Sequence, residues 1–328
     1  MKVGVLQFFS WSRRVPLTTV YERAFERVAI MDEGGYDAVW LAEHHFNTYS
    51  VCPSVTLMGT HVAARTSRLR IGTAVTLAGF YHPLRLAEEL ALLDMLSGGR
   101  LNWGAGRGFD PTEMRTFGVD PEQSAERYRE CVDIVLKAWQ DAPVSHAGKN
   151  WQFDNVDVLP KPLQQPHPPV WLAATSPESI VRAAEDGFTI LMDPHSSHSE
   201  IAKKRALYRT TLESSGFSMD GREIPTGRLM AIAETDAKAE EVARAGAAWT
   251  VGAYAKPKGT QFIGGESSVD QDPVDRYVND VVISGSPERV LDQLLQMQEE
   301  MPLDYLLANP LSHETFVLFT EKVLPKLI

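Results

Sequence analysis

The sequence has 328 residues, of which 44% are hydrophobic and 23% are charged, and its formal net charge at pH 7 is -11. These proportions are typical of globular proteins, and they exclude a chain that is disordered throughout. The acidic balance disfavours binding to nucleic acid or to an anionic membrane surface, so any site for a phosphate-bearing ligand must be a local positive pocket.

Cysteine content and hydropathy bear on where the protein is found. Cys52 and Cys131 are the only cysteines, too few for a disulfide scaffold or a four-thiolate metal centre, which is typical of a reducing cytoplasm. Residues 1–9 carry one lysine and a short apolar run without a small-residue cleavage site, which predicts a first strand rather than a signal peptide. No uninterrupted apolar stretch approaches the ~20 residues of a membrane-spanning helix. We therefore expect a soluble, cytoplasmic protein.

Short β-branched or apolar runs alternate along the chain with longer helical patterns, which is the signature of parallel βαβ units. The predicted strands are Lys2–Phe8, Ala38–Ala42, Arg70–Val75, Leu101–Ala105, Val170–Ala173, Thr189–Met192, Arg228–Ala233 and Tyr305–Ala308. The predicted helices are Val20–Glu33, Leu84–Met95, Ala125–Trp139, Pro177–Asp186, Glu200–Ser214, Ala237–Trp249 and Pro287–Glu299. Eight strands with interleaved helices predict an α/β fold, a closed (β/α)8 TIM barrel.

Two segments interrupt this alternation. Residues 141–165 contain Pro, Trp and Asn with an alternating pattern, which predicts a small β insertion. Residues 252–284 are long, contain Gly, Ser and Asp, and show no clear periodicity, which is typical of a mobile lid. Because no fixed repeat or low-complexity linker is found, we expect residues 1–328 to form a single domain with two insertions.

In such barrels the reacting groups lie on loops that leave the carboxyl ends of the strands. The second strand leads directly into Glu43, His44 and His45. An imidazole can move a proton near neutral pH, so these residues are candidates for acid or base chemistry. The alternative is that one or both histidines only hydrogen-bond a loop. A metal centre would need further converging ligands from neighbouring strands, and the sequence offers none, so no metal site is predicted.

The third and fourth strands end in small residues. The third ends near Ala74 and Val75, whose small side chains would let a flat ring lie against the barrel. The fourth runs through Gly104 and Gly106 into Arg107, so the backbone can approach a ligand beside a guanidinium suited to a phosphate. Alternatively, Arg107 is a surface residue paired with Asp110 or Glu113.

After the fifth strand, Thr175, Ser176 and Ser179 surround the start of a helix. Free backbone N–H groups and the positive end of the helix dipole make such a position suitable for an anion. The alternative is ordinary capping of the helix by Ser176. Since this helix start and Arg107 follow neighbouring predicted strands, both could bind one phosphate.

Several segments with these features, in the same order along the chain, resemble the bacterial luciferase family of flavin-dependent monooxygenases. The resemblance spans nearly the whole chain and is carried by residues 40–46, 70–75, 82–89, 96–101, 104–108, 171–176 and 284–288.

The resemblance implies that reduced FMN reacts with O2 to give a flavin C4a-(hydro)peroxide, which oxygenates a small organic substrate. A separate NAD(P)H-dependent flavin reductase would supply the reduced FMN. By the same resemblance, His44 matches the catalytic histidine, with Glu43 as its neighbour. Ala74 and Val75 fall where some members have a non-prolyl cis peptide beneath the isoalloxazine.

Arg107, Ser176 and Ser179 resemble the phosphate contacts of the family. The chain also departs from the light-emitting catalytic subunit, which has a reactive cysteine where this chain has Gly106 and a glutamate where it has Thr175. Bioluminescence is therefore not implied.

Two alternative functions stay open, and a second copy of the chain is expected as a partner. A deazaflavin-dependent enzyme of the same superfamily would transfer hydride without consuming O2, although its second-strand motif usually reads Asp-His. A non-catalytic accessory subunit would bind a partner chain and no flavin. The family also implies a homodimer, formed by the helices after the second and third strands, where Gly59, Ala63 and Ala64 permit close packing.

Overall fold

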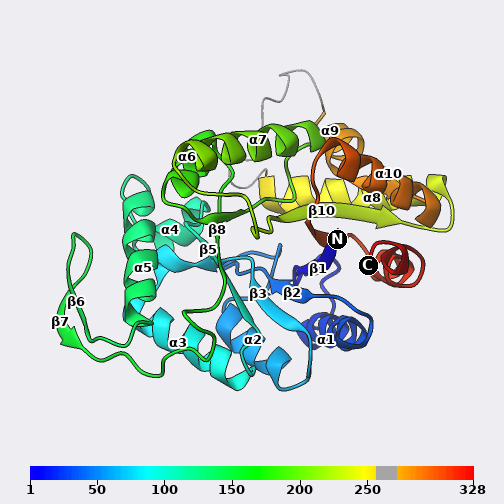
Figure 1. Ribbon diagram of the computed structural model, residues 1–328. Coiled ribbons are helices and arrows are strands. Elements are labelled where there is room, and N and C mark those ends of the chain that lie inside the picture. The colour runs from blue at the N-terminus through cyan, green and yellow to red at the C-terminus, as the bar shows by residue number, and fades with distance from the viewer. Residues whose placement is uncertain (256–271) are drawn as a thin grey trace.

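Figure 1 shows the computed structural model of the protein, which describes residues 1–255 and 272–328. Eight strands form one parallel sheet, each paired in register with the next. In ring order they are β1 (Lys2–Gln7), β2 (Ala38–Leu41), β3 (Arg70–Thr73), β5 (Leu101–Gly106), β8 (Val170–Ala173), β9 (Thr189–Leu191), β10 (Pro225–Ile232) and β12 (Tyr305–Pro310). A parallel bridge between Met192 and Thr226 joins β9 to β10. This bridge closes the sheet, so the predicted (β/α)8 barrel is confirmed.

Helices surround the barrel (Figure 1). They are α1 (Leu17–Glu33), α2 (Val55–Ala63), α3 (Pro83–Leu96), α4 (Pro111–Thr116), α5 (Ser124–Ala138), α6 (Pro177–Glu185), α7 (His198–Ser214), α8 (Asp236–Thr250), α10 (Pro287–Glu300) and α11 (His313–Leu318). All seven predicted helices are present. Ser176 and Ser286 cap α6 and α10, because each side chain accepts from the backbone N–H three residues on, with a proline at the first turn.

The first predicted insertion is a hairpin of β6 (Val144–Ala147) and β7 (Gln152–Val156), which confirms the expected β excursion. The second predicted insertion, the expected lid, is described only in part. Its described residues form the end of the π-helix η2 (Val251–Ala255), then α9 (Pro273–Arg276), the π-helix η4 (Tyr277–Val281) and β11 (Ile283–Gly285), which pairs with β10. The rest of the expected lid, residues 256–271, lies outside the described residues.

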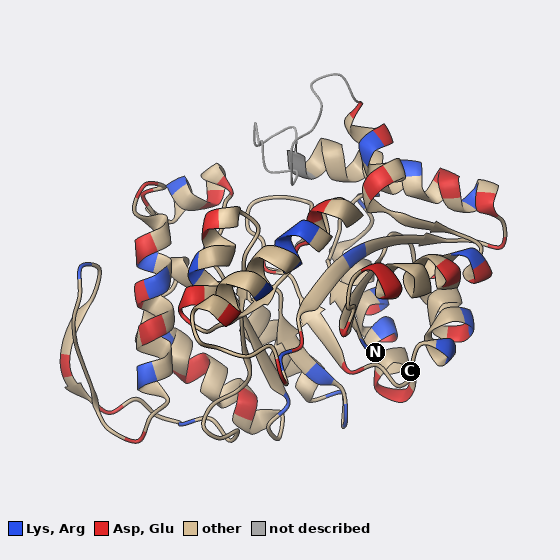
Figure 2. Ribbon diagram, turned by 45° about the horizontal axis from the view of Figure 1, so that its top comes forward, with Lys and Arg blue, Asp and Glu red and all other residues tan. Residues whose placement is uncertain are grey.

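Charges of both signs are interspersed over the outer helices (Figure 2). Such a mixture agrees with an acidic protein that does not rely on one basic face. Within residues 1–255 and 272–328, none of the helices combines the length and the apolar character that crossing a membrane requires.

Large aromatic side chains fill the interior of the barrel. Trp40 is fully buried, donates through its indole N–H to the Tyr305 hydroxyl at 3.0 Å, and meets the Trp171 ring edge to face at 5.3 Å between centroids. A Cβ on Gly72 would lie 2.2 Å from the Trp40 ring. The barrel interior is therefore a packed core, and room for a ligand must be sought at the carboxyl ends of the strands.

Strands β3 and β5 approach each other closely at Gly104. The Thr73 hydroxyl donates to the Gly104 carbonyl oxygen at 2.7 Å, and the Gly104 N–H donates back to that hydroxyl at 2.9 Å. A Cβ on Gly104 would lie 2.0 Å from the Thr73 carbonyl oxygen. No side chain fits there unless the two strands separate.

We expect Gly104→Ala to lower the free energy of unfolding by about 3 kcal/mol, because the added methyl overpacks two backbones. Denaturant titration followed by circular dichroism measures this change. The matched control is Gly252→Ala, whose added Cβ would meet nothing within 4 Å and should change stability by less than about 1 kcal/mol. Equal effects at both positions would contradict the close approach.

Candidate active site

His44 lies just beyond β2, and only 8% of its surface is exposed. Its Nδ1 is 3.5 Å from Oε1 of Glu113 on α4, and the same Glu113 oxygen accepts from the His45 backbone N–H at 2.8 Å. The rings of Phe8 and Tyr49 lie 6.2 and 5.5 Å from the His44 ring, between centroids. The imidazole is thus oriented by a buried carboxylate and enclosed by aromatic walls, an arrangement that can hold and move a proton.

Glu43 faces a different set of partners. Its carboxylate accepts from His45 Nε2 at 2.9 Å, from the Tyr81 hydroxyl at 2.9 Å and from the Leu77 N–H at 3.2 Å. Burial raises the pKa of Glu43, although these donors oppose the shift. The structure therefore brings Glu43 to His45, and it is Glu113 that lies beside His44. The alternative of a histidine that hydrogen-bonds a loop fits His45.

Beyond β3, the peptide bond between Ala74 and Val75 is cis. A Cβ on Gly106, at the end of β5, would lie 2.3 Å from Cγ2 of Val75. The Thr76 hydroxyl donates to the Gly104 carbonyl oxygen at 3.1 Å. These contacts lock the end of β3 against β5 and leave no room for a side chain at position 106.

Arg107 follows β5 and is exposed. In the described part of the chain its guanidinium has no hydrogen bond or ion pair, so pairing with Asp110 or Glu113 is not observed. Asp110 instead caps α4 by accepting from the Thr112 N–H at 2.8 Å. Arg107 is therefore free to contact an anion.

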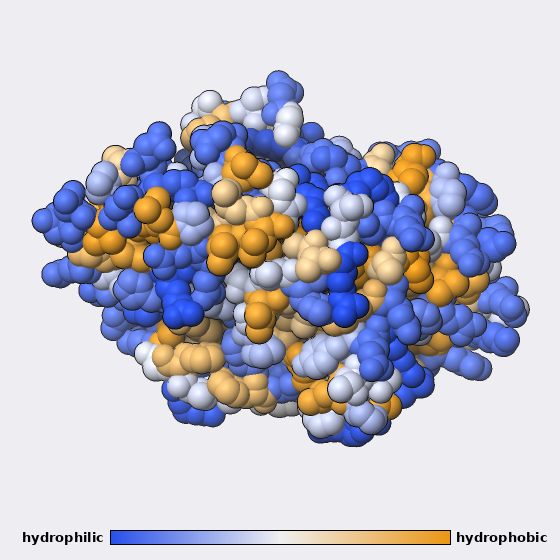
Figure 3. Space-filling model, turned by 90° about the horizontal axis from the view of Figure 1, so that it is seen from below, coloured by the Kyte–Doolittle hydropathy of each residue, from blue (hydrophilic) through white to orange (hydrophobic). Residues whose placement is uncertain are grey.

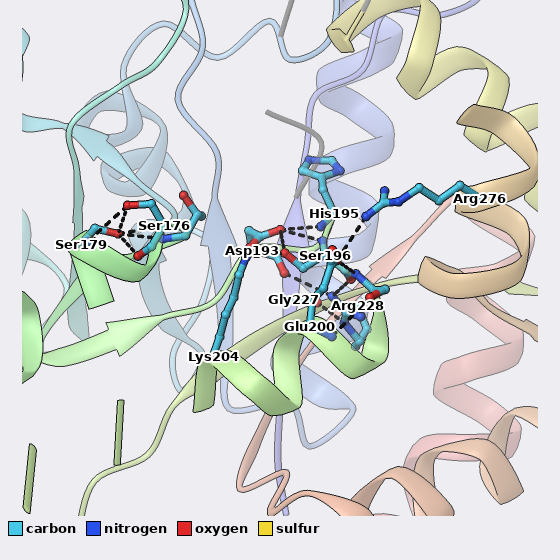
Figure 4. Close-up of polar contacts among 12 residues, drawn as sticks. Ser176, Ser179, Asp193, His195, Ser196, Glu200, Lys204, Gly227, Arg228 and Arg276 are labelled. Carbon is cyan, nitrogen blue, oxygen red and sulfur yellow. Dashed lines mark hydrogen bonds and ion pairs between the residues drawn. The ribbon is translucent and has the colours of Figure 1, made fainter. Parts of the chain in front are cut away.

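The three predicted residues at the start of α6 form a capping box (Figure 4). The Ser176 hydroxyl accepts from the Ser179 N–H at 3.2 Å, and the Ser179 hydroxyl accepts from the N–H groups of Thr175 and Ser176 at 3.2 and 3.1 Å. The pKa of the exposed Glu178 is lowered by its own N–H and by the Ser176 hydroxyl, so its carboxylate lies at this helix end. Capping by Ser176 is thus present, and a carboxylate already occupies the position suited to an anion.

Sequence reasoning missed a polar cluster beyond β9. Asp193 accepts from Lys204 at 3.3 Å, from the Ser196 hydroxyl and from the His195 and Ser196 N–H groups. Arg228, fully buried on β10, donates to the carbonyl oxygens of Asp193 and Ser196 (Figure 4). Polar residues at the carboxyl end of a strand were the available signal, the same one that identified His44.

A cavity of about 720 Å³ lies next to the aromatic wall of His44. It shares Phe8 and Tyr49 with that wall, and Leu229, Trp249 and Asn309 line other parts of it. Its lining does not include His44, Arg107 or Ser176. Phe8 and Tyr49 therefore lie between this cavity and His44.

The contribution of Asp193 to the free energy of unfolding should depend on pH. Burial alone would raise the pKa of Asp193, but Lys204, His195 and the Ser196 hydroxyl outweigh it and lower the pKa to about 2 from the ordinary 3.8. A lowered pKa adds stability that is fully present above pH 3.8 and is lost as the pH falls towards 2. Asp193→Asn should therefore lose a pH-dependent contribution of about 2 kcal/mol at pH 7.

Unfolding of the wild type and the variant between pH 7 and pH 3 measures this contribution. The difference should begin to shrink near pH 3.8. The control is Asp186→Asn, which removes an exposed pair with Arg182 and should cost about 0.5 kcal/mol or less. A difference that stays constant with pH would mean that Asp193 titrates normally in the folded protein.

Among curated proteins, the chain is 34% identical over 197 residues to the oxygenase component of flavin-dependent trigonelline monooxygenase from Acinetobacter baylyi, which covers 59% of this chain and 54% of that protein. The matched region spans about half the length of the curated relatives.

Three solved structures share the fold over nearly their full lengths. Monooxygenase RslO1 from Streptomyces bottropensis has a TM-score of 0.87 and 27% identity, with 100% of both chains covered. The oxygenating constituent of 3,6-diketocamphane monooxygenase from Pseudomonas putida, in complex with FMN, has a TM-score of 0.83 and 21% identity, covering 99% and 98%. An F420-dependent secondary alcohol dehydrogenase has a TM-score of 0.77 and 17% identity, covering 98% of both chains.

Residues 1–303, which make up most of the chain, match the model of a protein family described as luciferase-like monooxygenase. This description agrees with these relatives and with the barrel geometry. The chain belongs to the luciferase-like monooxygenase family.

Proposed function

We propose that this chain is the oxygenase component of a two-component monooxygenase, which uses reduced FMN and O2 to oxygenate a small organic substrate. A separate NAD(P)H-dependent reductase supplies the reduced flavin. The proposal is supported by the family and by the trigonelline monooxygenase relative, whose name describes an oxygenase component. The observation that carries it is the unpaired Arg107 at the same end of the barrel as the buried pair of His44 and Glu113.

The charge and the order of the residues at the barrel mouth support FMN as the ligand. The proposed contacts follow the neighbouring strands β2, β3, β5 and β8, which span three strand spacings or about 14 Å. Arg107 and the start of α6, with Thr175, Ser176 and Ser179, would bind the phosphate. Ala74 and Val75 would lie against the ring. Glu178 is exposed, so its carboxylate can turn away as the phosphate arrives.

Reduced FMN, when held by these residues, would supply the electrons for O2 activation. The protein contributes a proton-carrying group and a protected pocket. His44, held 3.5 Å from Glu113, accepts or donates a proton at the reacting centre. Phe8 and Tyr49 exclude water on one side of that imidazole.

The rival is a deazaflavin-dependent hydride transfer, and the F420-dependent dehydrogenase of similar fold is the observation that favours it. The two chemistries differ in the fate of O2, since only the monooxygenase places one of its atoms in the product. A third possibility, an accessory subunit without flavin, is tested by titrating the chain alone with FMN.

We also propose a homodimer. Figure 3 shows apolar residues gathered on the face that lies below in Figure 1, where α2 and α3 are found. These helices carry four exposed apolar side chains, Leu57 (74% exposed), Leu92 (48%), Met95 (47%) and Leu96 (58%).

The packing role expected of Gly59 is corrected, because a Cβ there would meet Leu93 and Ile71 of the same chain at 3.0 and 3.1 Å. Ala63 is buried as well, so the large apolar side chains provide the exposed surface.

The function is tested by supplying reduced FMN, ¹⁸O2 and a metabolite mixture to the purified chain, and by mass spectrometry of the products. We expect one labelled oxygen atom in one product. His44→Ala should lower the rate of labelling by about 10²- to 10⁴-fold with FMN affinity unchanged, whereas the exposed His82→Ala should match the wild type. Turnover of reduced F420 without O2 uptake would exclude the monooxygenase.

Arg107→Ala should weaken FMN binding by about 1.5–3 kcal/mol, or roughly 10- to 150-fold in Kd, because a charged hydrogen bond to the phosphate is lost. Fluorescence titration with FMN measures this effect. Arg115→Ala, which removes another exposed guanidinium nearby on α4, is the control. An unchanged Kd for Arg107→Ala would remove this residue from the phosphate site.

A further inference from the structure

A chain of three buried side chains crosses the barrel mouth. His195 Nε2 is 3.3 Å from the Tyr49 hydroxyl, and His195 Nδ1 is 3.2 Å from the Tyr277 hydroxyl. The exposed fraction is 3% for His195, 3% for Tyr49 and 0% for Tyr277. They come from the loops after β9 and β2 and from η4, so the chain connects three separate parts of the sequence.

His195 is neutral in this setting. Burial is the main cause that lowers its pKa, to about 4, and Arg228, His44 and Arg276 lower it further, while Asp193 opposes them. Other charges lie close by, since Lys204 pairs with Asp193 and Glu200 pairs with Arg276 at 3.1 Å (Figure 4). At neutral pH the ring therefore carries one N–H and one bare nitrogen.

Because His195 is neutral, its two ring nitrogens have different roles, one as a donor and one as an acceptor. If Nδ1 carries the proton, it donates to the Tyr277 oxygen, and Nε2 accepts the Tyr49 proton. If Nε2 carries the proton, it donates to the Tyr49 oxygen, and the Tyr49 hydroxyl proton points elsewhere. The tautomer of His195 therefore decides whether the Tyr49 hydroxyl donates to His195 or accepts from it.

The ring of Tyr49 also packs against His44. The two rings meet edge to face with centroids 5.5 Å apart, and a positive charge on His44 lowers the pKa of His195. On its other side His44 is faced by Glu113, with Phe8 and Phe109 as the neighbouring rings. Tyr277 is fully buried, and the preceding Arg276 is paired with Glu200 of α7.

We propose that His195 is a positioning residue for the chemistry at His44: it holds the hydroxyl of Tyr49, whose ring packs against His44, and the Tyr277 hydroxyl holds His195 from the other side. The inference rests on the proposed function only for the role of His44. The coupling itself is a property of the chain without flavin.

The test is a pH titration of the ¹⁵N-histidine-labelled full chain by NMR, which reports both the tautomer of His195 and the midpoint of the His44 titration. Tyr49→Phe should displace that midpoint by about 0.5 pH unit. Tyr277→Phe should displace it in the same direction by a smaller amount, and should change the ratio of the His195 tautomers. His195→Gln keeps one donor and one acceptor but fixes their order, so it should displace the midpoint as well.

The matched control is Tyr208→Phe, which removes another buried hydroxyl, bonded to the Phe188 carbonyl oxygen at 3.0 Å. It should leave the His44 midpoint unchanged. The inference is overturned if Tyr277→Phe and His195→Gln both leave the midpoint at the wild-type value, or if Tyr208→Phe displaces it equally. Absence of FMN binding together with intact coupling would instead refute only the proposed function.

Discussion

Buried carboxylates hold together the loops at the carboxyl ends of the strands, and the rest of the mouth depends on them. A carboxylate removed from water is costly unless donors surround it. Glu43 and Glu113 are 2 and 1% exposed, and the side chain of Asp193 is 12% exposed. Each accepts from a backbone N–H at the mouth: Glu43 from Leu77, Glu113 from His45 and Asp193 from His195. Each carboxylate therefore fixes the backbone that donates to it.

The same constraint explains the division of roles within the Glu43, His44, His45 run. Adjacent residues in an extended segment point to opposite sides. Glu43 and His45 face one side and bond each other, which leaves His44 alone on the side of Phe8 and Tyr49. The imidazole that faces the mouth is thus positioned by its neighbours in sequence and by Glu113 from α4.

Much of the fold could be predicted from the sequence, because each barrel strand is a short apolar run between helical patterns. Helix α2 is absent from the helices predicted by periodicity and was expected only from the family resemblance, since Val, Thr and Gly are weak helix formers that obscure its pattern. The residues His44, Arg107 and Ser176 could be proposed from the sequence because they directly follow strands. The positions of Glu113 and Tyr49 beside His44 could not, because only tertiary packing brings them there. The inward position of Gly59 likewise depends on its contact with Leu93, which spacing alone does not reveal.

The contact between Val75 and position 106 has a consequence for relatives and for protein engineering. A thiol at position 106 requires a smaller residue at 75, or a displaced strand end, so the two positions are constrained to vary together. A single exchange of Gly106 for cysteine would push against the very segment proposed to support the flavin ring. Grafting the light-emitting chemistry onto this scaffold therefore begins with Val75, in a paired substitution.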